Sequence, residues 1–396
     1  MNAPYPDFTS PDFLNDHISQ TLGFYENRAV DPAGGFFHCF EDDGRVYDCD
    51  LRHLVSSCRF VFDYALAHRE RGAPQHRKKA KHGLAFLEQA HRQPNGSYAW
   101  QLHKGTVIDG QVMAYGHAFV LIASSIALEA GIEEARATLD HVWEFMETHF
   151  WDPKHNAYAD EFNADMSKLS PYRGQNANMH SCEGCIAAYR ATGDARFLER
   201  AELLAQKFAR ELADKTDGLI WEHYDADWNP DYEYHRNKPN DLFKPWGIQP
   251  GHLVEWARLL LTLDAIRPQS WYLQRAADLY GAAVKFGRDE EYGGLVYGFA
   301  PDGIVCAREK YYWVHSETAA TAWRLYMRTG EDTYFEDYLD CWRYAWDHLI
   351  DHEHGAWFRV LTPEGNKIDN LKSPPGKTDY HTLGVCWDIL SVFDAG

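Results

Sequence analysis

The stretch Gly293-Gly-Leu-Val-Tyr-Gly-Phe-Ala-Pro-Asp-Gly-Ile-Val-Cys306, read GGLVYGFAPDGIVC, decides the fold because the chain repeats its pattern. An apolar run meets a tight turn at Gly303 and a second short run follows, as in a β-hairpin. Five other segments share this pattern: GGFFHCFEDDGRVYD, GSYAWQLHKGTVID, NAYADEFNADMSKLS, GLIWEHYDADWNPD and GAWFRVLTPEGNKID. The six turn residues are Gly44, Gly105, Asp165, Asp227, Gly303 and Gly365. One unit therefore recurs about every 60 residues.

Two kinds of helix fit between successive hairpins. The segment after each hairpin is apolar on most sides, as in residues 111–122 and 252–263, and is expected to be a buried inner helix. The next segment is amphipathic: residues 194–212 place Phe197, Leu204 and Phe208 on one face, which predicts an outer helix.

Counting these segments predicts an all-α (α/α)6 barrel in a single domain, residues 1–396, with short β-hairpins at one end. Inner helices are predicted near 51–70, 110–130, 176–192, 248–265, 311–330 and 379–391. Outer helices are predicted near 74–91, 132–149, 194–213, 269–286, 332–349 and 12–28. The last inner helix lacks a following partner and the first outer helix lacks a preceding one, so joining the termini closes a ring. An open solenoid is the alternative.

Polar side chains gather in the first turns of the predicted inner helices. These turns converge if all hairpins lie at one end of the ring, and burying the polar groups in an apolar core would be costly without partners or a ligand. The set is Arg52, His53, Tyr115, His117, Asn176, His180, Glu183, His252, Glu255, Trp313, His315, Glu317, Asp379, Tyr380 and His381. Any one histidine could be a satisfied core residue, but recurrence at equivalent positions predicts a common pocket.

The spacing within these turns supports a shared pocket. Asn176, His180 and Glu183 lie at i, i+4 and i+7, on one helical face, and His252 and Glu255 lie at i and i+3. Aromatic residues such as Tyr115, Trp246 and Trp313 interleave with them, and sugars offer C–H faces to stack and hydroxyls to bind. The sequence predicts a carbohydrate pocket, and the long segment before His252, residues 225–249, is either a lid over it or a passive insertion.

Composition restricts the partners. A net charge of −20 argues against nucleic acid and anionic membranes, and the substrate is expected to be a small sugar. No apolar run is long enough for a membrane span, and the start of the chain lacks a secretory signal, so we expect a cytoplasmic protein. The eight cysteines are expected to be reduced, and the Cys182/Cys185 pair to be part of a helix. The oligomeric state is left open.

The pocket residues favour proton transfer without a cofactor. No HExxH, P-loop or dinucleotide fingerprint is present, and the histidines lack a compact metal-ligand motif, so neither a cofactor nor a metal is expected. An imidazole near pKa 6.5 can take a proton from a carbon beside a carbonyl and return it. His381 and His252 on opposite walls could serve the two faces of a sugar enediol, while a third histidine assists ring opening.

Four segments resemble the N-acylglucosamine 2-epimerase superfamily, and most its aldose–ketose isomerase branch. They are RGQNANMHSCEG, KPWGIQPGHLVEWARLLL, YYWVHSETAAT and KTDYHTLGVCWDIL. The resemblance runs over nearly the whole chain. It implies an (α/α)6 barrel, metal-free acid/base catalysis and a free sugar substrate, with D-mannose to D-fructose, or D-lyxose to D-xylulose, as the expected reaction.

The resemblance also implies roles for individual residues. His381 would be the base at C2, His252 the second acid/base, and His180 with Glu255 would assist ring opening. Residues expected to hold hydroxyls or stack on the ring are Arg52, Tyr115, Asn176, Trp313 and Glu317, with Arg52 polarising the enediol oxygens. Trp246 is a further candidate for binding the substrate.

Two other activities stay open at this stage. A 2-epimerase would share the enediol and differ only in where the proton returns. A glycoside hydrolase could use two of Glu183, Glu255 and Glu317 as its carboxylate pair, since (α/α)6 barrels also host such enzymes. A non-catalytic sugar-binding ring is the remaining alternative.

Overall fold

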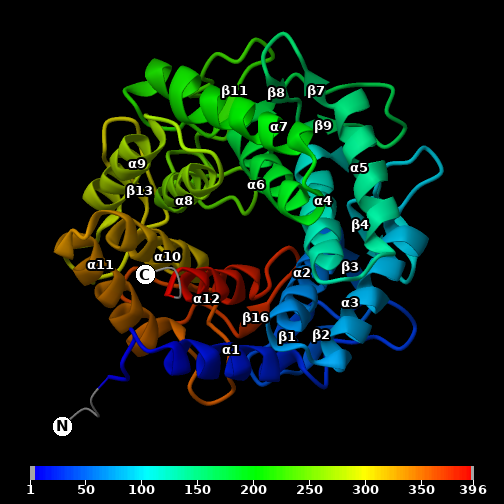
Figure 1. The fold of residues 1–396 in the computed structure, drawn as a ribbon, viewed down its shortest axis with the longest axis horizontal. Helices are drawn as coiled ribbons and strands as arrows, with labels where there is room; N and C mark the ends of the chain where they lie inside the picture. Colours follow the sequence, from blue (N-terminus) through cyan, green and yellow to red (C-terminus); the bar gives the residue numbers. More distant parts are fainter. Residues whose placement is uncertain (1–4, 394–396) are drawn as a thin grey trace.

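Two concentric rings of helices make up the structure, a computed structural model that describes residues 5–393 (Figure 1). The inner ring consists of α2 (Leu54–Arg71), α4 (Ala114–Glu129), α6 (Gln175–Thr192), α8 (Pro250–Ile266), α10 (Tyr312–Thr329) and α12 (Tyr380–Phe393). The outer ring consists of α1 (Pro11–Tyr25), α3 (Pro74–Phe86), α5 (Ala135–His149), α7 (Ala195–Gln206), α9 (Tyr272–Gly287) and α11 (Asp332–Tyr344). The predicted order and placement of both kinds of helix are confirmed.

Burial separates the two kinds of helix as the sequence pattern predicts. In α4 every residue from Ala114 to Ala127 is buried, because other inner helices and an outer helix surround it. In α7 the buried residues are Phe197, Leu198, Ala201, Leu204 and Ala205, which form one face. A helix that is apolar on all sides requires a complete surround, and the double ring supplies one.

Three outer helices continue as π-helical turns. α3 runs into Leu87–His91, α7 into Lys207–Leu212 followed by the 3-10 turn Ala213–Thr216, and α11 into Ala345–Leu349. These turns carry the chain from the outer ring towards the next hairpin.

The ring is closed by elements from the two ends of the described chain. Helix α1 packs against α12, and α12 also packs against α2 and α10 (Figure 1). The first outer helix therefore covers the last inner helix, as predicted from the unpaired helix at each terminus. This closure excludes the open solenoid.

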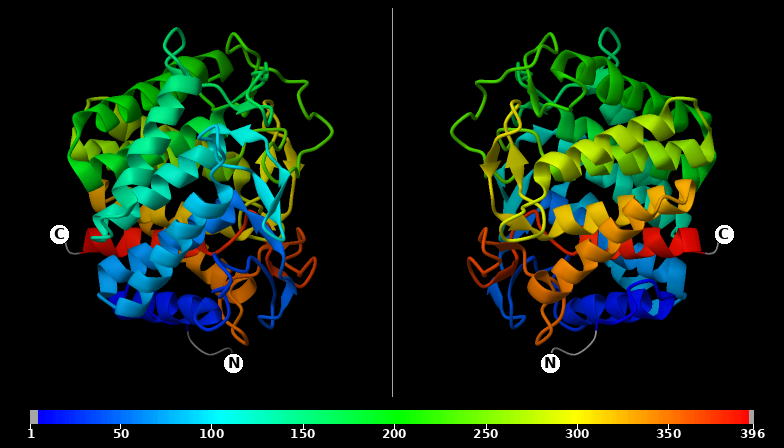
Figure 2. Two further views of the ribbon diagram at one scale, coloured as in Figure 1. Left: turned by 90° about the vertical axis from the view of Figure 1, so that its right-hand side faces the viewer. Right: turned by 90° about the vertical axis from the view of Figure 1, so that its left-hand side faces the viewer.

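All six predicted turns lie at one end of the barrel (Figure 2). Three form strand pairs: β1 (Cys39–Glu41) with β2 (Val46–Asp48), β4 (Gln101–His103) with β5 (Thr106–Asp109), and β12 (Gly298–Phe299) with β13 (Val305–Ala307). The other three are closed by the single bridges Phe162↔Leu169, Tyr224↔Pro230 and Leu361↔Lys367. The hairpins are shorter than their sequence pattern suggests, because the chain leaves the ladder to enter the helices.

A second set of strand pairs links neighbouring repeats. The segment before each inner helix pairs with the hairpin of the following repeat. These pairs are β3 (Leu51–His53) with β4, β6 (Val112–Met113) with β9 (Glu161–Phe162), β10 (Arg173–Gly174) with β11 (His223–Tyr224), Ile248 with Phe299, and β14 (Lys310–Tyr311) with β15 (Val360–Leu361). β16 (Leu371–Ser373) pairs with β1 and completes the circle, so each inner helix starts from an anchored strand. A further pair, β7 (Trp151–Asp152) with β8 (Ala157–Tyr158), lies after α5.

The long segment of residues 225–249 crosses the hairpin end of the barrel. Lys244 Nζ donates to Glu161 Oε2 at 2.7 Å, and Asn240 Nδ2 donates to Glu309 Oε1 at 2.9 Å. The ring of Phe243 lies 5.4 Å from that of Trp100. We call residues 225–249 the cover segment, because it spans the mouth of the barrel between repeats. Within residues 5–393 no helix is both long and apolar enough to cross a bilayer.

Candidate active site

A narrow cavity of about 10 Å³ lies under the cover segment, at the N-terminal ends of the inner helices. It is lined by Arg59, Tyr115, Asn176, His180, Leu242, Pro245, His252, Glu255, Tyr297, Trp313, Lys377 and His381. This volume holds about one water molecule, so a sugar requires the cover segment or its neighbours to move. We call this space the mouth cavity. It brings together seven of the predicted residues: Tyr115, Asn176, His180, His252, Glu255, Trp313 and His381.

His381 stands in the first turn of α12 with its imidazole fixed by two neighbours. Its Nδ1 lies 2.8 Å from Glu317 Oε1, and its Nε2 lies 3.4 Å from Arg59 Nη2. Burial, together with the positive charges of Arg59 and Lys377, lowers the pKa of His381 well below its usual 6.5. The carboxylate at Nδ1 holds the proton on that nitrogen. His381 therefore presents a neutral imidazole whose Nε2 can accept a proton.

His252 is held in the same way on α8. Only α10 separates α8 from α12, so the two histidines do not lie on opposite walls as expected. Its Nδ1 lies 2.8 Å from Glu222 Oε1, and Glu222 is in turn bonded by Gln175 Nε2 at 2.9 Å. Gln175 Oε1 accepts from Trp256 Nε1 at 2.8 Å, which fixes the orientation of the amide. Neither Glu222 nor Gln175 was among the residues expected in the pocket. Glu222 directly precedes β11 and is only 3% exposed, and its signal in the sequence was an acidic residue next to the apolar run GLIW of the fourth hairpin.

The ring of Trp313 lies beside both histidines. Its centroid is 5.2 Å from the ring of His252 and 5.5 Å from that of His381. Gly251 leaves room for the Trp313 ring, since a Cβ at residue 251 would lie 2.2 Å from that ring. The Pro250-Gly251 pair thus starts α8 and also leaves space for the aromatic wall.

His180 and Glu183 form the floor with Tyr380. His180 Nδ1 lies 2.9 Å from Glu183 Oε2, and Tyr380 donates its hydroxyl to Glu183 Oε1 at 2.6 Å. Burial lowers the pKa of His180 to about 4. Although burial opposes it, the hydrogen bond from His180 lowers the pKa of Glu183 to about 2. The pair is therefore a neutral imidazole donating to a carboxylate, and Tyr115 packs edge-on against it at 5.3 Å.

Glu255, Glu317 and His381 lie close enough to hold a metal ion, with one possible ligand atom of each within 4.8 Å of the others. Both Glu317 oxygens are already bonded, to His381 Nδ1 at 2.8 Å and to Arg258 Nε at 2.8 Å. Burial and the neighbouring Glu317 and Glu183 carboxylates raise the pKa of Glu255 well above its usual value. A metal would have to displace two charge-assisted bonds and a proton, so the donor set fits proton chemistry better.

Two cationic residues line the mouth cavity that sequence analysis did not single out. Arg59 Nη1 donates to Gly376 O at 2.8 Å, and its guanidinium lies over the rings of Phe119 and Tyr380. Lys377 Nζ lies 5.7 Å from the centroid of Trp313. Arg59 follows Arg52 by seven residues in the predicted inner helix 51–70. A spacing of seven residues places both on one face of a helix, and this was the signal in the sequence for Arg59.

Arg52 lies outside the mouth cavity. It forms an ion pair with Asp31 and donates to the carbonyl oxygens of Cys49 at 2.9 Å and Leu51 at 2.8 Å. Arg173 occupies the equivalent place two repeats later and bonds the carbonyl oxygens of residues 170 and 172 in the same way. Arg52 is therefore a repeat anchor for the strand before the helix, because its guanidinium satisfies carbonyls of the adjoining loop.

Glu317 and Trp246 also lie outside the cavity lining. Glu317 is one layer behind, where it holds His381, so the structure gives it a positioning contact and no direct access to the cavity. Trp246 donates its indole N–H to Tyr232 O at 2.7 Å and packs edge-on against Trp221 at 5.8 Å. Leu242 and Pro245 of the cover segment reach the cavity in its place.

Two further first-turn histidines have a structural role. His117 Nε2 accepts from Tyr98 N at 3.3 Å, and His315 Nε2 accepts from Leu295 N at 2.9 Å. Asn178 does the same for Tyr158 N at 2.7 Å. These side chains point outward and anchor the preceding strand, while His53 caps α2 by accepting from Val55 N. The eight cysteines are free thiols, and Cys182 and Cys185 are buried in α6 as expected.

Several buried polar atoms around the mouth cavity lack a hydrogen-bond partner among the described residues. They are Asn176 Oδ1, Glu255 Oε2, Trp313 Nε1 and Arg59 Nε. Unpaired buried polar groups are costly, and the hydroxyls of a sugar could satisfy them.

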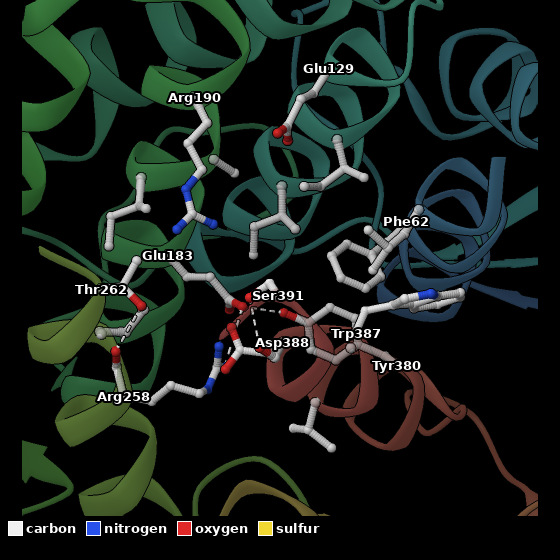
Figure 3. Close-up of a pocket in the computed structure, with 18 of the residues that line it drawn as sticks. Phe62, Glu129, Glu183, Arg190, Arg258, Thr262, Tyr380, Trp387, Asp388 and Ser391 are labelled. Carbon is white, nitrogen blue, oxygen red and sulfur yellow. Dashed lines mark hydrogen bonds and ion pairs between the residues drawn. The ribbon is translucent and has the colours of Figure 1, made fainter. Parts of the chain in front are cut away.

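A larger cavity of about 240 Å³ opens at the opposite end of the inner ring (Figure 3). It is lined by apolar residues such as Ile122, Ile126 and Trp387, and by the charged residues Glu129, Arg190 and Asp388. We call it the rear cavity. It reaches the other side of Glu183, Glu317, Arg258 and Tyr380, so these residues form a wall between the two cavities.

Comparisons with known proteins give one family. The family model described as N-acylglucosamine 2-epimerase matches residues 35–385. A D-mannose isomerase of Marinomonas mediterranea is 47% identical over 387 residues, covering 98% of each chain. A cellobiose 2-epimerase of Bacteroides fragilis is 22% identical, covering 94% of this chain and 96% of the other. A crystal structure of D-mannose isomerase superposes with a TM-score of 0.97 at 47% identity, covering 98% of this chain and 100% of that chain.

Proposed function

We propose that this chain, which belongs to the N-acylglucosamine 2-epimerase family and is an isomerase, interconverts D-mannose and D-fructose. The observation that carries the proposal is the pair of buried imidazoles, His252 and His381. A buried carboxylate holds Nδ1 of each, and both rings line one cavity. Such an arrangement suits removal and return of a carbon-bound proton at neutral pH.

His381 is the proposed base at C2. Its neutral imidazole takes the C2 proton on Nε2, and Glu317 stabilises the imidazolium that forms. Arg59 Nη2 lies 3.4 Å from His381 Nε2. Arg59 is therefore proposed to polarise the sugar oxygens, the role expected of Arg52. Return of the proton to C1 completes the aldose-to-ketose change.

Ring opening requires a proton donor and acceptor near the anomeric oxygen. His180, with Glu255 in the lining of the same cavity, is proposed for this step, because the raised pKa of Glu255 favours its protonated form and one of its oxygens is unpaired among the described residues. His252 is the second acid/base, held by Glu222. Trp313 and Tyr115 supply the aromatic walls and Asn176 a hydrogen-bonding group.

A 2-epimerase is the second candidate, because two imidazoles face the cavity and could serve opposite faces of the enediol. The carboxylates give less support to a glycoside hydrolase. Glu183 and Glu317 are committed to His180, His381 and Arg258. Glu255 alone of these three lines the mouth cavity, whereas that chemistry needs two carboxylates flanking the bond.

A proton NMR time course with D-mannose in D2O containing a chelator tests the proposal. We expect fructose with deuterium at C1. Glucose as the main product would favour the epimerase. No conversion of mannose, and no deuterium in it, would contradict both activities on this sugar.

A further inference from the structure

Lys377 differs from the other buried lysines of the described chain. Lys310 Nζ donates to Asp289 at 2.6 Å, and Lys372 Nζ donates to Asp351 at 2.6 Å. These two pairs occupy equivalent repeat positions, because 372 − 310 and 351 − 289 are both 62. Lys377 is only 6% exposed and lines the mouth cavity. Its Nζ has neither an ion pair nor a hydrogen bond among residues 5–393, which is costly for stability and typical of a functional group.

The backbone around Lys377 is held from several elements. Ser56 Oγ accepts from Gly376 N at 2.8 Å, and Tyr312 donates to Thr378 O at 2.6 Å. Gly376 has φ +79°, and a Cβ there would lie 2.7 Å from Phe243 of the cover segment. The turn that carries Lys377 is therefore held by hydrogen bonds from two inner helices, four residues before His381 on the same stretch of chain.

The charges around Lys377 place its amine near neutrality. Burial lowers the pKa of Lys377 to about 7, together with the positive charges of Arg59 in α2 and Arg359 directly before β15. The negative charge of Glu255 in α8 opposes this shift. Lys377 in turn contributes to lowering the pKa of His53 at the end of β3 and of His381 in α12. The amine can thus exist both with and without its proton at physiological pH.

An aldose-to-ketose conversion moves two protons. One passes from C2 to C1, and His381 accounts for it. The other passes from the C2 hydroxyl to the C1 oxygen, because the aldose has a carbonyl at C1 and the ketose has one at C2. A group that gives a proton to one oxygen and takes one from its neighbour is required for the second transfer.

We propose that Lys377 is the catalytic residue that carries the proton between the two sugar oxygens, an inference that rests on the proposed isomerase function. In the first step His381 Nε2 takes the C2 proton, the electron pair forms the C1–C2 double bond, and the C1 oxygen takes a proton from the Lys377 ammonium. In the second step the Lys377 amine takes the proton of the C2 hydroxyl, C2 becomes the carbonyl carbon, and C1 takes the proton from the His381 imidazolium. Both residues return to their starting states.

Other residues of the cavity are less suited to this transfer. Arg59 does not release a proton in the neutral pH range. Glu255 would have to ionise beside Glu317 and Glu183, whose charges raise its pKa. His252 already bonds Glu222 and is assigned as the second acid/base.

Lys377→Arg and Lys377→Met test the proposal. Each variant is incubated with D-mannose in D2O, and deuterium at C2 of recovered mannose is counted beside fructose formed. Arginine keeps the charge and cannot shuttle a proton. We expect Lys377→Arg to retain C2 exchange within about 3-fold while fructose formation falls about 100-fold. In Lys377→Met the ratio of exchange to fructose should also rise, by at least about 10-fold.

A matched control removes another buried lysine. Lys372→Met combined with Asp351→Asn deletes a buried ion pair outside the cavity without leaving a charge unpaired. It should leave the ratio of exchange to fructose at the wild-type value, whatever its effect on stability. In Lys377→Ala, added ethylammonium should restore part of the fructose formation, which a purely structural role would not allow.

Three results would overturn the inference. They are fructose formation by Lys377→Arg within about 3-fold of wild type, an equal loss of exchange and fructose formation in Lys377→Met, and no rescue of a folded Lys377→Ala by the amine. Failure of the isomerase proposal is seen separately, because wild-type protein would then form no ketose before any variant is made.

Discussion

The mouth cavity and the rear cavity share a wall and differ in nearly everything else. The rear cavity is the larger, about 240 Å³ against about 10 Å³, yet no histidine lines it among the described residues. The mouth cavity is small and is lined by three histidines and by Lys377, whose Nζ has no hydrogen bond or ion pair within residues 5–393. The mouth cavity is therefore proposed as the active site on the arrangement of its titratable groups and not on its size.

The shared wall explains how one set of residues serves both sides. Glu183 and Glu317 present hydrogen-bonded oxygens to His180 and His381 on the mouth side. On the rear side Arg258 pairs with both, with Nε 2.8 Å from Glu317 Oε2 and Nη2 3.7 Å from Glu183 Oε1. Arg258 lowers the pKa of both carboxyl groups. The pKa of Glu183 falls to about 2, whereas burial raises that of Glu317 to about 7. The comparison predicts that changes in the mouth cavity alter chemistry and changes in the rear cavity alter only stability.

The largest effect is expected from His381→Asn. Loss of the base should lower kcat for mannose roughly 10³-fold, because no other imidazole contacts Glu317 Oε1. The measurement is fructose formation by NMR. His315→Asn, which changes a structural histidine of a neighbouring inner helix, should keep kcat within about 3-fold while lowering Tm. Equal losses in both variants would contradict the separation.

Glu317→Gln should lower kcat roughly 10²-fold, because an amide does not stabilise the imidazolium of His381. KM should change little, since Glu317 does not line the mouth cavity. Steady-state kinetics at several pH values provide the check. A rise in KM with unchanged kcat would show that Glu317 binds the sugar directly, as the resemblance to the family implied.

Acid should destabilise the mouth end first. Burial lowers the pKa of His117 and His180 to about 4, and of His53 and His315 to about 3. Their native pKa values lie below the unfolded value near 6.5, so the unfolded chain binds more protons between these limits and stability falls as pH drops below 6.5.

Each such histidine should cost on the order of 2 kcal/mol between pH 7 and pH 5. Urea unfolding at these pH values measures the loss, and hydrogen exchange should show faster opening at the hairpin end than around the rear cavity. His315→Gln should flatten the pH dependence. A free energy of unfolding that is constant from pH 7 to pH 5 would contradict this prediction.

Glu222→Gln should lower kcat roughly 10-fold, less than Glu317→Gln, because His252 acts as the second acid/base and the first proton removal stays with His381. The matched control is Glu147→Gln. Glu147 lies in the outer helix α5 and accepts from the Tyr158 hydroxyl, so this change should leave kcat unchanged. A loss as large as that of His381→Asn would make His252 the primary base.

The smallest effect is expected from filling the rear cavity. Ala187 lines it, and Ala187→Leu adds apolar volume there. We expect kcat to stay within about 2-fold and the free energy of unfolding to change by about 1 kcal/mol or less. A ten-fold fall in kcat would show that the rear cavity takes part in the reaction.

Sequence patterns predicted the helices better than the roles of single side chains. The apolar repeat placed all twelve helices within the described residues, and the unpaired end helices predicted closure. His180, His252 and His381 were expected in the pocket and lie there, although their catalytic roles remain to be tested. Arg52 was expected in the pocket and lies outside it, because a position in the first turn gives the end of the helix but not the direction in which the side chain points.

The sequence by itself determined the number and kind of helices, because a helix buried on one face repeats apolar residues at the helical period and a fully buried helix is apolar on all sides. It also determined that polar groups meet at one end. Only the tertiary structure decided which of them face the cavity. His117 and His315 turn outward to accept backbone N–H groups, while His252 and His381 turn inward to buried carboxylates. Packing brings Glu222 to His252, 30 residues away in the sequence. It also leaves Lys377 in the cavity lining without a charged partner among the residues that the structure describes.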